Sequence, residues 1–484
     1  MNVTFSVLDA QNSFCYVVHI ILTERHTRVQ RPQISCCVCA DNITRGCIAR
    51  LLFKTQITHG IYVQQIYRRW KNESNSPPKD FRNLQTMQDI KLKLSNIMGI
   101  SGKYENEERG WLSEYLPKEQ NELPPRSMND SFDRAIVPLS TDLTLQNKYT
   151  TTFKSLRIGR LLEDMDLFAV WIVMKHIYNP MQPLDVPTPY VVVTLLVDDV
   201  VINANRFPDK DLILSGQVTH VGKTSLEVTL WLEQLNNDKF ERITRAHFVF
   251  VARDPTNTSS VMVNNLVPVG EREKNVMILS AKKNEDRKMA RQNSILNKMP
   301  TPEEQSLIYE TFMKTVNRKE PIIGNKILPE NSVWMDDTML ETNILCHPED
   351  RNLHNTVFGG YLMRVATELG FLVASAHSKT RVTLEAINSI TFRKPVPIGS
   401  KLKLNGQICY TSGRVMIVEI IAKVEELESK RSLTSNSFYH VYVAPNDVDS
   451  VLPQNYHDSM LFIDGRRRYL DFVNHLEKGQ PEDN

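Results

Sequence analysis

Two local features of this 484-residue sequence could do chemistry, and the first is a carboxylate inside an apolar helix. Asp166 lies in the run MDLFAVWIV, where burial disfavours a charged group and should raise its pKa. A buried carboxylate with a raised pKa is typical of general acid or base catalysis. Alternatively, Asp166 shares a solvated helix face with Glu163, three residues earlier. The local sequence leaves both interpretations open.

The second feature is the glycine pair Gly359-Gly360, which opens another apolar helix. Adjacent glycines at a helix start let a substrate approach the backbone and leave free N–H groups facing it. Together with the positive end of the helix dipole, these donors suit a developing oxyanion. The alternative is a tight turn in which the glycines only permit close packing, and the local sequence by itself favours that alternative.

The elements that must position these residues occur twice. A long apolar helix is expected at 156–176 and again at 359–377, and each is followed by consecutive strand-like runs, at 190–252 and at 381–444. The run SGQV at 215–218 matches NGQI at 405–408 with an offset of 190, and FVA at 250–252 matches YVA at 442–444 with an offset of 192. Ordered matches at a nearly constant offset indicate a duplicated domain.

Each copy predicts an antiparallel sheet around a central helix. Helices and strands do not alternate singly, and a helix that is apolar on nearly all sides must be wrapped by a sheet. We therefore expect an α+β fold, a tandem (double) hotdog in which each half is a long central helix wrapped by a curved antiparallel sheet. The predicted domains are a basic N-terminal extension (1–84), a first hotdog domain with its leader (85–260), a linker with helices (261–330), a second hotdog domain (331–475) and a tail (476–484). Within the linker, a capping box at Thr301 predicts a helix start, and the basic stretch 282–298 predicts an exposed helix.

Composition excludes several classes of function. Lys and Arg number 58 against 56 Asp and Glu, so the net charge of +2 predicts no nucleic-acid partner. No apolar run reaches the roughly 18 residues that a membrane span needs. Five of the seven cysteines lie within the first 47 residues, which favours a reduced, intracellular protein. Cys36, Cys37, Cys39 and Cys47 lack paired CxxC spacing, so no metal site is predicted.

The N-terminal stretch has the composition of a targeting segment. Residues 1–70 carry eight Lys or Arg and three acids, and residues 48–70 contain arginines but no acid and are amphipathic in pattern. These properties are typical of a mitochondrial presequence. We therefore predict a mitochondrial protein, in the matrix or associated with the inner membrane. The alternative is an unstructured basic extension.

The ordered set of motifs resembles the acyl-CoA thioesterases of the hotdog superfamily, most closely the mitochondrial acyl-CoA thioesterase 9 type. The resemblance spans about residues 85–470, and its motifs are RIGRLLEDMD at 157–166, VGKTS at 221–225, VWM at 333–335, FGGYLMR at 358–364, KPV at 394–396 and SML at 459–461. It implies hydrolysis of acyl-CoA to free fatty acid and CoA, without a metal or organic cofactor.

The resemblance also implies one site between the two halves. One half supplies a carboxylate, Asp166, and the other supplies Asn355 and the helix start at Gly360 as catalytic groups, with His354 and Gly359 contacting substrate. When Gly159 is laid on Gly360, Asp166 falls opposite Thr367, and Glu368 lies one place further along. Glu368 is therefore the candidate for a second, mirror-image site.

Coenzyme A would bring phosphates to this site. Lys223, Arg393, Lys394 and Arg414 are candidates to pair with them, although solvated surface charge is the favoured interpretation for each one taken singly. A homo-oligomer is expected, with a trimer of double hotdogs as one form. Two other functions remain open: a hotdog hydratase or dehydratase, suggested faintly by the acid and histidine of DRNLH at 350–354, and a non-catalytic acyl-CoA binding protein.

Overall fold

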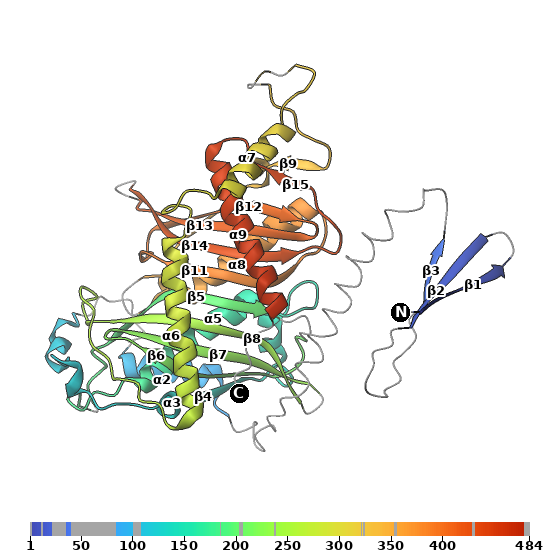
Figure 1. Cartoon of the computed structure of the whole chain (residues 1–484). Coiled ribbons are helices and arrows are strands. Elements are labelled where there is room, and N and C mark those ends of the chain that lie inside the picture. Colours follow the sequence, from blue (N-terminus) through green and yellow to red (C-terminus); the bar gives the residue numbers. More distant parts are fainter. Residues whose placement is uncertain are drawn as a thin grey trace. The chain divides into compact units, whose positions relative to one another are not determined.

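The computed structural model describes residues 84–478 except 100–107, 184, 203–206, 237–238, 321, 323–324, 353–355 and 428–430, together with three N-terminal strands. The chain divides into two compact units, Met1–Ser74 and Asn75–Asn484 (Figure 1). In the first unit, β1 (Asn2–Ala10), β2 (Ser13–Ile21) and β3 (Ser35–Cys39) form an antiparallel sheet in that order. The presequence-like residues 48–70 lie outside the described residues.

One ten-stranded antiparallel sheet forms the frame of the second unit (Figure 1). Its order is β10-β12-β13-β14-β11-β5-β8-β7-β6-β4, so the five strands of one half mirror the five of the other across the β11–β5 junction. The first half contains β4 (Asp133–Val137), β5 (Val191–Ile202), β6 (Leu212–Val221), β7 (Ser225–Asn236) and β8 (Lys239–Arg253), and the second contains β10 (Leu340–Leu345), β11 (Thr383–Phe392), β12 (Lys401–Ser412), β13 (Val415–Glu425) and β14 (Ser432–Val443).

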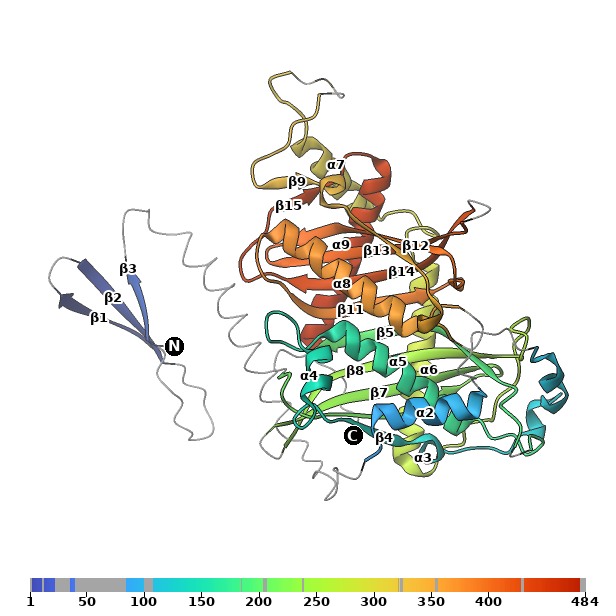
Figure 2. The ribbon, with the colours of Figure 1, turned by 180° about the vertical axis from the view of Figure 1, so that it is seen from behind.

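Helices cover both faces of this sheet. The two long apolar helices, α5 (Ile158–His176) and α8 (Gly359–Ser378), lie on one face (Figure 2), and α6 (Gly270–Gln292) and α9 (Tyr456–Lys478) lie across the other (Figure 1). Both central helices are buried over most of their length, because nearly all their sides are apolar. The predicted α+β tandem hotdog is thus confirmed.

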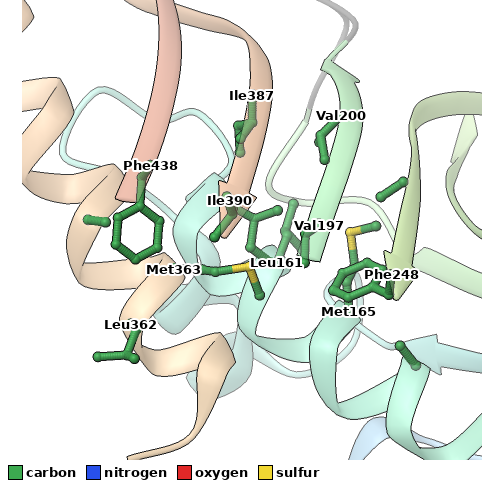
Figure 3. Close-up of a cluster of buried hydrophobic side chains, with 14 of the residues drawn as sticks. Leu161, Met165, Val197, Val200, Phe248, Leu362, Met363, Ile387, Ile390 and Phe438 are labelled. Carbon is green, nitrogen blue, oxygen red and sulfur yellow. The ribbon is translucent and has the colours of Figure 1, made fainter. Parts of the chain in front are cut away.

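The junction between the halves obeys a local two-fold relation. In the antiparallel β5–β11 pairing, Val197 lies opposite Ile390 and Val200 opposite Ile387. At the repeat offset of 190, Ile387 is the counterpart of Val197 and Ile390 is the counterpart of Val200. Val197 therefore pairs with the counterpart of Val200, and Val200 with the counterpart of Val197, as in the self-complementary interface of a symmetric dimer. Side chains from both halves meet beneath this junction and form one continuous core (Figure 3). That core fixes α5 and α8 against each other.

Several shorter elements complete the unit. They are α2 (Met87–Met98), η3 (Gly110–Tyr115), η4 (Gln120–Glu122), α3 (Met128–Ser131), α4 (Leu143–Tyr149), α7 (Pro302–Lys314), β9 (Ser332–Trp334), η5 (Met335–Thr338), η6 (Pro348–Asp350) and β15 (Ser450–Leu452). The capping box predicted at Thr301 is confirmed at the start of α7. Among the helices of the described residues, none combines the length and apolar character that crossing a bilayer requires. The domain boundaries given above stay a prediction.

The basic stretch at 282–298 was predicted to be an exposed linker helix, and most of its residues are exposed, in α6 and in the turn after it. One side of α6 also contacts the sheet, which the sequence did not predict. Arg287, whose side chain is 13% exposed, places Nε 2.7 Å from Asp198 Oδ2 and also pairs with the buried carboxylate Glu227. This side of α6 therefore pairs with acids on the outer face of the first half, while Lys288 and Arg291 face solvent.

Candidate active site

Asp166 lies at the point where the two halves meet, and its side chain is completely buried. Its Oδ1 accepts a hydrogen bond of 3.0 Å from the hydroxyl of Thr194 on β5. The other carboxylate oxygen, Oδ2, is buried and has no hydrogen-bond partner of good geometry among the described residues. The interpretation of Asp166 as part of a solvated stripe is therefore wrong.

Burial controls the charge of this carboxylate. Removal from water raises the pKa of Asp166 to about 7, and the negative charge of nearby Glu163 acts in the same direction. The Thr194 hydroxyl and the backbone N–H of Gly360 oppose the rise by favouring the ionised form. A carboxyl group with a pKa near neutrality can accept and return a proton at physiological pH.

The free oxygen of Asp166 faces the first residue of α8. A Cβ atom placed on Gly359 would lie 3.0 Å from Asp166 Oδ2 and 3.4 Å from the ring of Phe392. Phe358, at the N-cap position, has no side chain that could cap the helix, and in the first turn the Gly360 N–H faces the Asp166 carboxylate. The arrangement joins a carboxylate of the first half to an uncapped helix N-terminus of the second.

Gly360 serves a different purpose from Gly359. A Cβ there would lie 2.8 Å from the Cα atom of Glu163, so this glycine permits close contact between α8 and α5. The counterpart contact is similar, because a Cβ on Gly159 would lie 3.2 Å from the Cα atom of Arg364. The absence of a side chain at Gly360 therefore serves helix packing, while its backbone N–H faces the Asp166 carboxylate and Gly359 borders the same group. The catalytic role of Gly360 stays a prediction.

Ion pairs close the contact between the two central helices. Glu163 Oε2 lies 2.9 Å from Nε of Arg364 and 2.7 Å from a guanidinium nitrogen of Arg160. Glu163 and Arg364 are counterparts in the repeat, so this pair lies at the local two-fold axis. It holds the N-terminal part of α8 beside Asp166.

The mirror-image position lacks a buried free carboxylate. Thr367, the counterpart of Asp166, is buried and its hydroxyl donates to the backbone oxygen of Met363. Glu368 is 40% exposed, and its Oε1 accepts a hydrogen bond of 2.8 Å from Nε of Arg157. Glu368 therefore neutralises an arginine at the start of α5 and does not lie in the environment of Asp166.

Two predicted site residues, His354 and Asn355, lie outside the described residues. The base of their loop is described: the Phe358 N–H donates to the Asp350 carbonyl oxygen (2.9 Å), and the Val357 N–H donates to that of Val396 (2.8 Å). These bonds fix the loop directly before α8. The roles of His354 and Asn355 stay predictions.

Three of the four predicted phosphate-binding cations lie at the end of the sheet that holds the site. Exposed Arg393 and Lys394 directly follow Phe392, whose ring borders Gly359. Lys223 lies just before β7. The first residue of β7, Ser225, pairs with Val251 on β8, and Val251 pairs on its other side with Val193 on β5, next to Thr194. Arg414 lies just before β13. The first residue of β13 pairs with the last residue of β14, which pairs with the first residue of β11, at the end of that strand opposite to Phe392. The structure therefore separates Arg414 from the other three.

Sequence reasoning missed two residues of this site, Thr194 and Phe392. Thr194 is the one polar residue in the stretch VVVTLLV at 191–197, and such a break in an apolar strand was the available signal. Phe392 carried no signal, because an aromatic residue at a strand end is ordinary. No group of three or more His, Cys, Asp or Glu side chains in the part of the chain described here could hold a metal ion.

Fold and site together define a tandem hotdog protein with a buried carboxylate facing a helix N-terminus, and comparison with known proteins agrees. A family model described as "Thioesterase superfamily" matches residues 354–429. Mitochondrial acyl-coenzyme A thioesterase 9 of Mus musculus is 36% identical over 388 residues, covering 78% of this chain and 88% of that protein. The Homo sapiens protein of the same name is also 36% identical, with 79% and 88% covered. Mitochondrial acyl-coenzyme A thioesterase 4 of Humulus lupulus is 31% identical, with 70% and 65% covered.

This chain belongs to the acyl-CoA thioesterase family of the hotdog fold. The match to the relatives named thioesterase 9 covers 78% and 79% of this chain, so it includes residues of both halves. Their names place them in mitochondria, which supports the mitochondrial localisation predicted from the N-terminal charge.

Proposed function

We propose that this chain hydrolyses acyl-CoA thioesters to a carboxylic acid and free CoA, at one site formed by both halves. The observation that carries the proposal is the buried Asp166 on α5, whose free oxygen faces the uncapped start of α8 at Gly359. The names of the relatives support the substrate class.

Asp166 acts as general base in this proposal. Its ionised form takes a proton from a water molecule, and the oxygen of that water forms a bond to the thioester carbonyl carbon. When the tetrahedral intermediate collapses, the carbon–sulfur bond breaks and Asp166 returns the proton to the departing thiolate. Thr194 holds one carboxylate oxygen, so the other, Oδ2, is the one that handles the proton.

The start of α8 stabilises the negative charge that develops on the thioester oxygen. First-turn N–H groups of a helix have no intrahelical partners, and the dipole adds positive potential there. Asn355, four residues before Gly359 in the sequence, is proposed to orient the water or the carbonyl. Arg393, Lys394 and Lys223 are proposed to pair with CoA phosphates, because they lie at the same end of the sheet.

The reaction class is tested with a panel of saturated acyl-CoAs and enoyl-CoAs of several chain lengths. Hydrolysis releases a free thiol from the saturated substrates, and we expect this release. A hydratase would instead change the enoyl absorbance without releasing thiol, and a binding protein would give neither signal. Either of those two results would contradict the proposal.

Assembly and localisation complete the proposal. Strands β4 and β10 form the two edges of the described sheet, and an edge strand can pair with another chain, which favours a homo-oligomer such as a trimer of double hotdogs. Light scattering coupled to size exclusion measures this state. Residues 1–85 fused to a fluorescent protein should enter mitochondria, and fractionation then separates matrix from inner-membrane association. A diffuse cytosolic signal would contradict the targeting role.

A further inference from the structure

A second buried polar group without a partner lies close to the candidate site. Asn436 on β14 is completely buried, and its Nδ2 has no hydrogen-bond partner among the described residues. Its Oδ1 accepts a hydrogen bond from the hydroxyl of Ser435. With Oδ1 engaged, the free end of the amide is Nδ2, which carries two N–H donors.

The position of Asn436 connects this donor to the start of α8. Asn436 lies directly opposite Phe392 in the β11–β14 pairing, and directly paired side chains on one face of a sheet are neighbours. It shares its face with Phe438, two residues further along, which packs edge-on against the ring of Phe392. Phe392 in turn borders Gly359, where Asp166 Oδ2 lies. The acceptor Oδ2 of Asp166 and the donor Nδ2 of Asn436 are both buried without a hydrogen-bond partner among the described residues. The first lies beside Gly359 and the second is next to Phe392, and these two residues contact each other.

The neighbouring backbone also leads toward the predicted phosphate-binding cations. The N–H of Arg393 donates to the Ser435 carbonyl oxygen (3.0 Å), and the single proton of the Ser435 hydroxyl is shared between Asn436 Oδ1 and the carbonyl oxygen of Lys394, which lies 2.5 Å away. Asn436 thus lies between the residues that would hold the CoA end of a substrate and the helix start that would hold its thioester.

The first half has no such donor at the equivalent place. Thr244 is the counterpart of Asn436, because it pairs with Ile202 and Leu232 as Asn436 pairs with Phe392 and Ala422. The Thr244 hydroxyl is satisfied by the Arg245 carbonyl oxygen. An unpartnered amide in a core lowers stability, so its presence beside one site and absence at the mirror position point to a ligand.

We propose that Nδ2 of Asn436 donates a hydrogen bond to a carbonyl oxygen of the bound acyl-CoA, either that of the thioester or that of a pantetheine amide. The inference rests on the proposed function and deepens it by assigning a further substrate-binding residue. The donor compensates in the complex for the hydrogen bond that Asn436 lacks in the ligand-free protein.

The test compares Asn436→Leu with Thr244→Val, the matched change in the other half, in the full chain. Asn436→Leu should lower kcat/KM for acyl-CoA on the order of 10-fold to 100-fold while the thermal midpoint stays level or rises. Thr244→Val should leave kcat/KM within about twofold of the wild type. A purely structural role for Asn436 would instead lower the midpoint and spare turnover, and that result would overturn the inference.

Two further arms locate the contact and keep the test independent of turnover. With an acyl thioester of 2-mercaptoethanol, which lacks the pantetheine amides, a persisting loss assigns the contact to the thioester carbonyl and a vanishing loss assigns it to a pantetheine amide. Binding of a 2-oxoalkyl-CoA thioether, which keeps a carbonyl and cannot be hydrolysed, should weaken about tenfold in Asn436→Leu. Unchanged binding together with unchanged turnover would overturn the inference. Absence of turnover in the wild type would contradict the proposed function alone, because the binding arm still tests Asn436.

Discussion

Asp166 shows how burial prepares a side chain for chemistry at a cost in stability. The folded protein holds the pKa of this group near 7, above the value of about 4 expected for an unfolded chain. Ionisation therefore favours the unfolded state as pH rises from 4 through 7. Replacing Asp166 with Asn should raise the free energy of unfolding above pH 7, by about 4 kcal/mol at most.

The same pKa predicts the pH dependence of turnover. A general base works only when it is ionised, so kcat/KM should rise with pH and level off above a midpoint near 7. Asp166→Asn should lose this rising limb along with most activity. A wild-type profile that is flat between pH 5.5 and 8.5 would contradict the assignment of Asp166 as base.

Gly359 and Gly360 can be separated by paired alanine substitutions. A methyl group at Gly359 would crowd Asp166 Oδ2 and the place proposed for the thioester oxygen. Gly359→Ala should therefore lower kcat/KM roughly 10-fold or more with little change in the free energy of unfolding. Gly360→Ala would press on the backbone of Glu163 and should lower the thermal midpoint. Equal effects of the two changes on both measurements would contradict this division of roles.

At this scale the sequence predicted what depends on local pattern. The unusual position of Asp166 in an apolar run was visible because helix periodicity and hydrophobicity are properties of neighbouring residues. Thr194, Phe392 and the partner of Glu368 were not, because each is defined by which distant strand or helix lies beside it. His354 and Asn355 stay predictions.

Strand β14 carries a buried histidine where its counterpart β8 carries a phenylalanine. His440 is completely buried and neither ring nitrogen has a partner among the described residues, whereas the counterpart position holds Phe248. Burial lowers the pKa of His440 to about 3. The neutral ring is therefore required in the folded core of the second half.

Acid should destabilise the protein through this residue. The folded pKa lies below the unfolded value of about 6.5, so the stabilisation is complete above pH 6.5 and is lost progressively as pH falls toward 3. Between pH 7 and pH 5 the loss should be about 2 kcal/mol. Denaturant unfolding at both pH values measures it, and His440→Leu should remove that part of the pH dependence. An identical dependence in the variant would contradict the argument.

The sequence predicted the long elements with a periodic apolar pattern. It did not predict the short strands or the contacts that depend on residues far apart in the sequence. The central helices α5 and α8 and the strands that follow them carry strong apolar patterns, and the start of α7 carries its own capping box. The fifth strand of each half, β4 or β10, is only five or six residues long and precedes the helix, so it lacked a signal. The contact of one side of α6 with the sheet includes ion pairs of Arg287 with the distant acids Asp198 and Glu227, which periodicity cannot show.

At the scale of the whole molecule, the second compact unit resembles a two-fold symmetric dimer whose two copies are joined in one chain and have diverged in sequence. At the local two-fold axis a symmetric dimer would place identical side chains together, whereas this chain places Glu163 against Arg364. The two halves also differ at the position of the proposed catalytic carboxylate. The first half has Asp166 there, whereas the second has Thr367, and the next residue, Glu368, is paired with Arg157. A fused pair can therefore complete one site from complementary parts, with no need for each half to be catalytically complete.

Comparison of two carboxylate variants tests this single-site account most directly. Turnover of the best acyl-CoA substrate is measured as kcat/KM for Asp166→Asn and Glu368→Gln beside the wild type, after circular dichroism has confirmed that both variants fold. Asp166→Asn should lose roughly 10²–10⁴-fold, as expected when a general base is removed, and Glu368→Gln should stay within about threefold of the wild type. A loss below about tenfold for Asp166→Asn, or an equal loss in both variants, would contradict a single site built on Asp166.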